Sequence, residues 1–260
     1  MKDLYAGKHA LVTGGTQGLG EAIARALVCE GAAGVAVVGR DVVRGERVAA
    51  ELTRLGSDGV FLRADLRDPA SCAEVAAEAA QRFGCIDGLV NSAASTARAT
   101  LDETSVEMFD DMFAVNVRAP LLLMQAVIRD MRRCGAGGSI VNVLSMSVYG
   151  GQPHLAAYAA SKGALATLTK NVAYAHRFER IRVNGLLLGW TDTPNEDAVQ
   201  REVHDQPKDW LARAEAAAPM RKLIKPGEVA DLVTLLLSDR GGVMTGALID
   251  YSQDVPGGGD

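Results

Sequence analysis

The stretch Thr13-Gly14-Gly15-Thr16-Gln17-Gly18-Leu19-Gly20 separates a short apolar run, residues 9–13, from a helical pattern over residues 21–30. Glycines allow the backbone to turn tightly and to approach a pyrophosphate, whose charge is favoured at a helix N-terminus. The spacing is TGxxxGxG rather than GxGxxG, and a glycine-rich turn alone is also compatible with a plain connection. Its place between the first strand and the first helix favours a dinucleotide-binding turn.

Short apolar runs alternate with Ala-rich helical patterns along the rest of the chain. Further strands are predicted at residues 35–38, 60–62, 86–90, 139–143, 181–187 and 248–251. An amphipathic helix is predicted through Val48, Leu52 and Leu55, and further helices at residues 68–83, 105–117, 119–133, 155–177 and 227–237. Such alternation is typical of βαβ units and a parallel sheet. The sequence therefore predicts an α/β fold, a doubly wound, Rossmann-type parallel sheet with helices on both faces, forming one domain over residues 1–260.

Residues 191–219 interrupt this alternation, because they are polar and acidic and carry Pro194, Pro207 and Trp210. Insertions of this kind are usually lids or binding loops. We expect residues 190–219 to form a substrate loop, and an unstructured surface loop is the alternative.

Composition excludes several classes of protein. The chain has 260 residues, is 48% hydrophobic and 23% charged, and carries a formal net charge of −5, which is typical of a folded globular protein. The mild acidity argues against a nucleic-acid partner. No apolar run reaches the roughly 18 residues that a membrane span needs, and the first residues lack the apolar stretch of a signal peptide. We expect no membrane partner.

The four cysteines, Cys29, Cys72, Cys85 and Cys134, show neither a CxxC pair nor metal-ligand spacing. They are interpreted as small buried apolar residues in a reducing compartment. This predicts a cytoplasmic protein without a metal site.

The end of the second strand bears on cofactor choice. Dinucleotide sites place an acidic residue here for a ribose 2′-hydroxyl or an arginine for a 2′-phosphate. Arg40 could clamp a phosphate through its guanidinium, or be an ordinary solvated residue. Asp41 takes the acidic role if the strand ends one residue later. NADP is favoured, and NAD remains possible.

Tyr158 and Lys162 are four residues apart in the sequence Tyr158-Ala159-Ala160-Ser161-Lys162, on one face of a predicted helix. A neighbouring ammonium favours the phenolate and lowers its pKa from about 10, so that the phenol can exchange a proton with an alcohol. Ser145 lies thirteen residues earlier, just past a predicted strand, and could hydrogen-bond a substrate oxygen. Ser147 competes with Ser145 for this role.

At this point the chain resembles the short-chain dehydrogenase/reductase family, in its short single-domain branch. The resemblance spans nearly the whole length. It rests on TGGTQGLG at 13–20, Asp65-Leu66, NSAA at 91–94, Asn116, Ser145, YAASK at 158–162, Val183-Asn184, Gly189 and Thr193.

The resemblance implies an NAD(P)-dependent oxidoreductase. Tyr158 would be the general acid/base, Lys162 would lower its pKa and hold the nicotinamide ribose, and Ser145 would orient the substrate oxygen. Asn116 would support a water-linked proton relay, or would satisfy a kinked helix backbone. The implied cofactor-binding residues are Gly14, Thr16, Gln17, Gly18, Leu19, Gly20, Arg40, Asp65, Leu66, Asn91, Ala93, Tyr158, Lys162, Gly189, Thr191 and Thr193.

Three departures from the family pattern stand out. Asn91-Ser92-Ala93-Ala94 replaces an NNAG-like turn, Leu188-Gly189-Trp190 replaces a Pro-Gly pair, and residues 250–254 replace an Asp-Gly-Gly run. None removes a proton-transfer residue. The last region commonly packs between subunits in the family's tetramers, so this departure bears on the assembly and not on the chemistry. The resemblance itself implies a homo-oligomer, a tetramer or a dimer.

The substrate face is expected at residues 146–154 and in the substrate loop. It offers many hydrogen-bonding groups and few large apolar ones, which favours a small-molecule sugar or polyol. A ketoacyl or keto-ester reductase and a non-catalytic nucleotide-binding regulator are the alternatives. The substrate candidates are Ser147, Gln152, His154 and Trp190, with Tyr149, Asp192 and Glu196 as further polar groups on this face.

Overall fold

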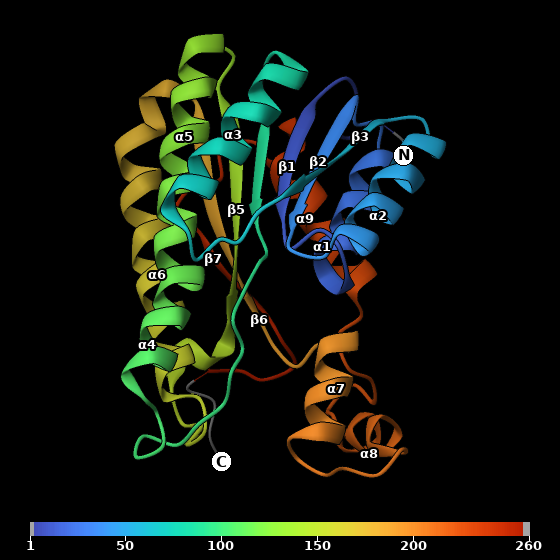
Figure 1. Cartoon of the computed structure of the whole chain (residues 1–260), viewed down its shortest axis with the longest axis vertical. Coiled ribbons are helices and arrows are strands. Elements are labelled where there is room, and N and C mark those ends of the chain that lie inside the picture. Colours follow the sequence, from blue (N-terminus) through green and yellow to red (C-terminus); the bar gives the residue numbers. More distant parts are fainter. Residues whose placement is uncertain (1–2, 257–260) are drawn as a thin grey trace.

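The computed structural model describes residues 3–256 and contains one seven-stranded parallel sheet of order β3-β2-β1-β4-β5-β6-β7. This order places β1 and β4 side by side, where the direction of winding reverses (Figure 1). The predicted doubly wound, Rossmann-type fold is confirmed. The strands are β1 His9–Thr13, β2 Gly34–Gly39, β3 Asp58–Arg63, β4 Gly88–Asn91, β5 Gly138–Ser145, β6 Ile181–Leu188 and β7 Leu248–Tyr251.

Helices cover both faces of the sheet, since successive strand side chains point to opposite sides. In β1, Leu11 joins the core beneath α3, α5 and α6, whereas Ala10 and Val12 join the core beneath α1, α2 and α9. Both cores are almost wholly apolar, which gives a rigid base to the strand ends. The helices are α1 Gly18–Cys29, α2 Val42–Arg54, α3 Pro69–Phe83, α4 Val106–Phe113, α5 Ala119–Cys134, α6 Ala156–His176, α7 Pro194–Glu202, α8 Trp210–Ala217 and α9 Pro226–Leu237.

The segment predicted as a substrate loop contains two helices, α7 and α8, which lie together beyond the carboxyl ends of the strands (Figure 1). Thr193 caps α7 by accepting a hydrogen bond from the backbone of Glu196, and Pro194 follows it at the first helical position. Trp210 is 4% exposed and stacks on Trp190 with 6.0 Å between ring centroids. The alternative of an unstructured surface loop is therefore wrong, because local capping and aromatic packing order the segment.

The helical stretch Val106–Cys134 is long and apolar enough to cross a membrane by length and composition, since its most apolar 18-residue window has a mean hydropathy of 1.3. It consists of α4, a π-helical turn η1 (Ala114–Arg118) and α5. Half of its most apolar window is buried, and Leu123, Met124 and Val127 pack into the core against the sheet. Its hydropathy is thus accounted for by packing within the fold.

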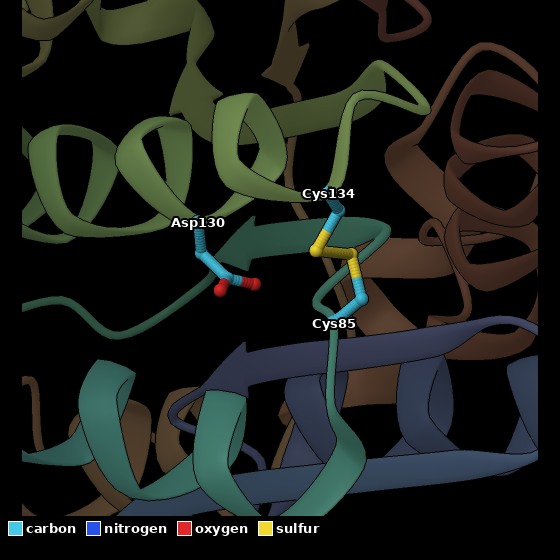
Figure 2. Close-up of side chains that lie close together, drawn as sticks. All are labelled: Cys85, Asp130 and Cys134. Atoms are coloured by element: carbon cyan, nitrogen blue, oxygen red, sulfur yellow. A yellow bond between two sulfur atoms is a disulfide. The ribbon is translucent and has the colours of Figure 1, made fainter.

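Two of the four cysteines are paired, which corrects the expectation of four free thiols. Cys85, just before β4, forms a disulfide with Cys134 at the end of α5 (Figure 2). Cys72 is buried as expected, but Cys29 is exposed. The pairing was not apparent because 49 residues separate the two cysteines. Since disulfides are rare in reducing compartments, cysteine usage no longer supports a cytoplasmic location, which stays a prediction.

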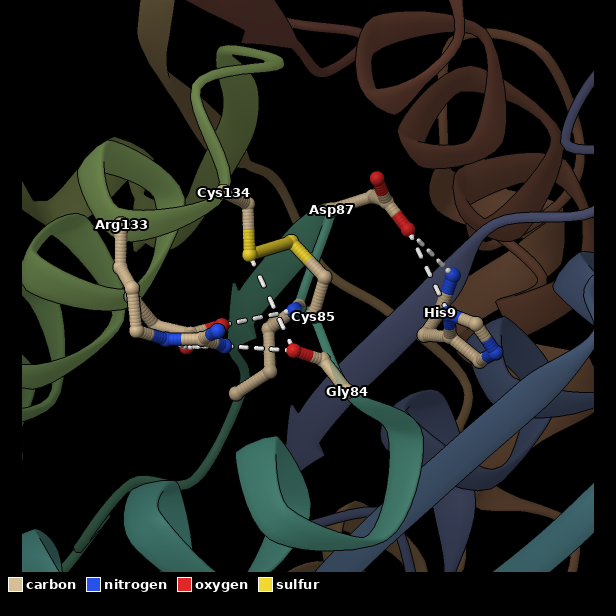
Figure 3. The surroundings of a disulfide bond; sticks show 8 residues. His9, Gly84, Cys85, Asp87, Arg133 and Cys134 are labelled. Carbon is tan, nitrogen blue, oxygen red and sulfur yellow. Dashed lines mark hydrogen bonds and ion pairs between the residues drawn. A yellow bond between two sulfur atoms is a disulfide. The ribbon is translucent and has the colours of Figure 1, made fainter.

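Asp130 lies beside this disulfide, so that three side chains with metal-ligating atoms come within 4.8 Å of one another. Its carboxylate is already occupied, accepting hydrogen bonds from the backbone of Ile86 at 2.8 Å and from Arg133 at 2.6 Å. Arg133 also donates to the carbonyl of Gly84, beside the disulfide (Figure 3). Asp130, Arg133 and the disulfide therefore hold the C-terminal end of α5 against the segment that leads into β4.

Candidate active site

A pocket of about 1260 Å³ lies at the carboxyl edge of the sheet, where the turn after β1 meets the ends of β5 and β6 and the start of α6. The glycines of the turn fit closely against the backbone. A Cβ on Gly14 would lie 2.9 Å from the Cα of Ala93, and one on Gly20 would lie 2.3 Å from the carbonyl oxygen of Gly14. Gly14 also has a φ of +65°. Only glycine satisfies these positions, and the result is a backbone cradle at the N-terminus of α1.

The N-terminus of α1 faces this cradle without a side-chain cap. Gln17 is the N-cap residue, but its amide oxygen accepts a hydrogen bond from Arg44 instead of capping the helix. The first-turn amides of α1 are thereby left for an anion, which the helix dipole favours. Arg44 was not singled out from the sequence, because its approach to the turn depends on how α2 packs beside α1.

Arg40 and Asp41 differ in whether their side chains are free to bind a cofactor. Asp41 caps α2 by accepting from the backbone of Arg44 at 2.9 Å, and pairs with the Arg44 guanidinium at 2.9 Å. The sequence-based alternative of Asp41 as a ribose ligand would require the loss of this cap. Arg40 is exposed at the pocket and makes no hydrogen bond or ion pair within residues 3–256. Its guanidinium is therefore the free cation at this end of the pocket among the described residues.

Asp65 and Leu66 follow β3 and line the same end of the pocket. Arg67 donates to the Asp65 carboxylate at 2.6 Å, and this hydrogen bond lowers the pKa of Asp65 to about 2. Leu66 is 8% exposed and offers an apolar surface. A flat apolar contact beside fixed charges suits an adenine ring.

Lys162 is buried at the start of α6, with 2% of its surface exposed. Its Nζ donates to the carbonyl of Val143 at 2.8 Å and lies 5.7 Å from the centroid of the Tyr158 ring. Desolvation disfavours the ammonium and lowers the pKa of Lys162 to about 8.

The pKa of Tyr158 is raised by burial, not lowered as the sequence predicted. Desolvation of the phenolate outweighs a hydrogen bond with the Ser145 side chain and the charge of Arg98, both of which lower the pKa. Lys162 is turned toward Val143 instead of toward the phenol. The sequence spacing placed the two groups on one face, but not their final orientation.

The two candidate serines occupy different positions. Ser145 ends β5, lines the pocket and accepts a hydrogen bond from the backbone of Ser147 at 3.2 Å. Ser147 is 4% exposed, and its hydroxyl has no hydrogen-bond partner within the described residues. Of the two serines, Ser145 is the one whose side chain lowers the pKa of Tyr158, which separates the two candidates.

Asn116 lies in the π-helical turn η1, is fully buried and does not line the pocket. Its side chain accepts from the backbone of Ser95 at 2.8 Å, and donates to the carbonyl of Ser95 at 2.9 Å and to Ser161 at 3.0 Å. The side chain thus fixes the segment after β4 against α6. This arrangement agrees with the backbone-satisfying role that the sequence left open.

Asn91 also points away from the pocket. It is 2% exposed and donates to the side chain of Asn142 in the neighbouring strand at 2.8 Å. Two of the polar groups expected on the substrate face do not line the pocket, because Tyr149 donates to Asp250 and Asp192 accepts from Lys225, each at 2.9 Å. The other candidates line it. They are, from the predicted cofactor-binding set, Gly14, Thr16, Gln17, Gly18, Leu19, Gly20, Arg40, Asp65, Leu66, Ala93, Tyr158, Lys162, Gly189, Thr191 and Thr193, and from the predicted substrate set, Ser147, Gln152, His154 and Trp190.

Arg98 and His204 line the pocket near Tyr158 but were not singled out from the sequence. Arg98 pairs with Glu196 at 3.0 Å, and Glu196 also accepts from the indole of Trp190 at 2.9 Å. These residues come from segments about 100 positions apart. The only available signal was their position after β4 and β6, whose carboxyl ends meet at this edge.

A pocket at the carboxyl edge of a doubly wound sheet, with a glycine-rich turn before the first helix, defines the dinucleotide-binding class of fold. A family model described as enoyl-(acyl carrier protein) reductase matches residues 14–252. Cis-4-hydroxycyclohexanecarboxylate dehydrogenase of Sinomonas cyclohexanicum is 34% identical over 251 residues, which cover 96% of each chain.

Two further similarities involve sugar-related enzymes. Sorbitol dehydrogenase of Cereibacter sphaeroides is 36% identical over 199 residues, 76% of each chain. The structure of L-sorbose reductase from Gluconobacter frateurii, complexed with NADPH and L-sorbose, superimposes with a TM-score of 0.91 at 27% identity, covering 97% of this chain and 98% of that chain. The chain belongs to the short-chain dehydrogenase/reductase family and is an NAD(P)-dependent oxidoreductase that acts on CH–OH groups.

Proposed function

We propose that the protein interconverts a secondary alcohol and the corresponding ketone of a sugar or polyol, with NADP as the preferred cofactor and Tyr158 as the general acid/base. The convergence of Ser145, Tyr158 and Lys162 in the pocket that begins at the glycine-rich turn carries this proposal. A dinucleotide extended along that pocket from Arg40 would bring its reactive end to these three side chains.

Each residue has a role that follows from its position. A nicotinamide cofactor, held at its ribose by Lys162, would supply the hydride-transfer chemistry at the carbon that bears the substrate oxygen. In alcohol oxidation, Tyr158 takes the proton of the hydroxyl group, and in ketone reduction it gives that proton back. Ser145 donates a hydrogen bond to the substrate oxygen. Lys162 holds the ribose beside Tyr158, and its charge then favours the phenolate.

Burial contributes to this chemistry. The raised pKa of Tyr158 keeps the phenol protonated at neutral pH, as ketone reduction requires. Alcohol oxidation needs the phenolate, which Ser145 and Arg98 favour. Asn116 acts indirectly by holding the backbone of Ser95, which lines the pocket. We also propose that a water-linked proton relay passes through the region around Asn116.

The cofactor preference rests on Arg40. The backbone cradle and the α1 N-terminus suit a pyrophosphate, and the unpaired guanidinium of Arg40 suits a 2′-phosphate. The relative whose structure contains NADPH supports this choice. NAD would bind the same cradle without using the Arg40 charge.

The substrate class rests on the polar wall of the pocket. Ser147, Gln152, His154 and Trp190 lie there, beside the apolar Met146 and Leu155. The relatives named sorbitol dehydrogenase and L-sorbose reductase support a polyhydroxylated substrate.

For the assembly and location, we propose a homo-oligomer, a tetramer or a dimer, in the cytoplasm, with residues 1–260 forming one domain. The family resemblance supports the assembly. Light scattering on the purified protein gives the mass directly, and a monomer at micromolar concentration would contradict it.

A turnover screen tests the proposed function. Sugars, polyols, simple secondary alcohols and β-hydroxyacyl esters are each supplied with NADP or NAD, and reduced nicotinamide is followed by absorbance. We expect polyol turnover, faster with NADP. Turnover of the β-hydroxyacyl esters alone would favour the ketoacyl reductase alternative, and cofactor binding without any turnover would favour the regulator.

A further inference from the structure

Five polar side chains form a connected group on the substrate side of the pocket, here called the Arg98 cluster: Arg98, Trp190, Glu196, Gln200 and His204. The Arg98 guanidinium donates from Nη2 to both oxygens of Glu196, at 3.1 and 3.0 Å, and its Nη1 lies 2.6 Å from Nε2 of His204. The Arg98 and Glu196 side chains are 22% and 15% exposed. Because little of either side chain is exposed to water, the two charged groups are held in a fixed orientation relative to each other.

Both members of the pair are held in place. Oε1 of Glu196 accepts further hydrogen bonds from Trp190 at 2.9 Å and from Gln200 at 2.7 Å. The backbone next to Arg98 is fixed as well, since Ala99 donates to the carbonyl of His154 at 3.0 Å, four residues before Tyr158. The pair thus connects α7 to the segment that leads to the catalytic helix α6.

Fold stability does not account for this arrangement. Burying an ion pair seldom stabilises a protein relative to apolar packing, because both charges lose their hydration. Nη1 of Arg98 carries two N–H groups, and its side-chain contact within residues 3–256 is with His204; Oε2 of Glu196 accepts only the Arg98 bond there. One donor and one acceptor position therefore remain unused beside Tyr158.

We propose that the Arg98–Glu196 pair determines substrate specificity by binding a second, uncharged hydroxyl group of the substrate and by disfavouring a carboxylate at that position. This inference rests on the proposed function. A hydroxyl group donates and accepts at once, and so matches an unused donor beside an unused acceptor. A carboxylate can only accept, and it would add a second negative charge next to Glu196, with Arg98 already neutralised.

The same pair influences the proton-transfer group. The charge of Arg98 lowers the pKa of Tyr158, whereas the charge of Glu196 raises it. The other groups around the phenol are Lys162 on its own helix and Ser145 at the end of β5, while the imidazoles of His154 and His204 line the same pocket. Removing each member of the pair should therefore shift the pH profile of turnover in opposite directions.

The test compares D-sorbitol with D-gluconate, in which a carboxylate replaces one terminal hydroxymethyl group. Wild-type enzyme, Glu196→Gln and Arg98→Gln are assayed for kcat/KM with NADP, and Glu202→Gln is the control on the same helix, where the residue is exposed. We expect wild-type enzyme to prefer sorbitol, and Arg98→Gln to lose about 10- to 100-fold on it, since a hydrogen bond from a charged donor is removed.

Glu196→Gln leaves the Arg98 charge uncompensated. It should raise the gluconate-to-sorbitol ratio of kcat/KM at least about 10-fold and lower the pH midpoint of sorbitol oxidation, whereas Arg98→Gln should raise that midpoint. NADPH fluorescence titration checks that the variants still bind cofactor. If sorbitol is turned over but both variants keep the wild-type ratio and midpoint, or if wild-type enzyme prefers gluconate, this inference is overturned while the proposed oxidoreductase stands. If neither compound is turned over, this inference is overturned, whereas the proposed substrate class falls only if the turnover screen finds no sugar or polyol substrate.

Discussion

Lys162 donates a 2.8 Å hydrogen bond from Nζ to the carbonyl oxygen of Val143, a residue within the central strand β5. The bond anchors a fully buried ammonium to the sheet, 5.7 Å from the ring centroid of Tyr158. Because desolvation lowers the pKa of Lys162 from 10.5 to about 8, this charge costs folding free energy at neutral pH. The protein keeps a destabilising group at the proposed site of proton transfer.

Replacing Lys162 by methionine should reveal this cost as a pH-dependent difference in stability. The unfolded state binds more protons than the folded state between pH 8 and 10.5, so wild-type stability rises with pH across that window. Relative to Lys162→Met, wild-type protein should gain about 2 kcal/mol between pH 7 and 9.5. Urea unfolding of both proteins at the two pH values measures the gain. A difference that stays constant with pH would contradict the burial of a charged lysine.

Arg40 should determine the cofactor preference. We expect wild-type protein to bind NADP about 10- to 100-fold more tightly than NAD, because a charged hydrogen bond to the 2′-phosphate is gained. Arg40→Asp should reverse this preference, and Arg129→Asp, on the exposed side of α5, should leave it unchanged. Fluorescence titration of both reduced cofactors is the measurement. Equal affinities in wild-type protein would refute the role of Arg40.

Ser145 and Ser147 should respond differently to alanine substitution. Ser145→Ala removes the side chain that lowers the pKa of Tyr158 and that is proposed to hydrogen-bond the substrate oxygen, and it should lower kcat about 100-fold. Ser147→Ala removes a buried hydroxyl that lacks a partner, so stability should stay constant or rise by up to about 1 kcal/mol. Any kinetic effect of Ser147→Ala should appear in KM. If kcat fell for Ser147→Ala and not for Ser145→Ala, Ser147 rather than Ser145 would be the serine that hydrogen-bonds the substrate oxygen.

The disulfide between Cys85 and Cys134 should stabilise the fold without affecting the chemistry. Closing a loop across 49 residues typically contributes about 2–4 kcal/mol. Reductant should therefore lower the unfolding free energy of wild-type protein by that amount, and Cys134→Ser should match the reduced protein. Cys29→Ser, at an exposed free thiol, serves as the control and should respond to reductant like wild type. Titration of four free thiols in unreduced protein would rule the disulfide out.

Local patterns predicted the strands and most helices closely. The run predicted at residues 35–38 is β2, Gly34–Gly39, and the helix predicted at 155–177 is α6, Ala156–His176. Residues 191–219 were misjudged because their polar composition resembles a loop. The order in α7 and α8 comes from the Thr193 cap and from Trp190 stacking on Trp210, a contact that depends on folding.

The site was predictable where the chain itself sets the spacing, as with Tyr158 and Lys162 on one helix. The Arg98–Glu196 pair and the Cys85–Cys134 disulfide join residues far apart in the sequence, so no local pattern reveals them. The sequence also did not predict the directions in which side chains point. Asn91 and Asn116 turn inward because each finds a buried polar partner, in Asn142 and in the backbone of Ser95.

The substitution Tyr158→Phe tests the central claim most directly, because it removes one hydroxyl group and leaves the ring in place. We predict that the variant binds NADPH as tightly as wild type, measured by fluorescence titration, and loses at least about 1000-fold in kcat for the polyol found in the turnover screen. Retained turnover with unchanged cofactor affinity would contradict the assignment of Tyr158 as the general acid/base.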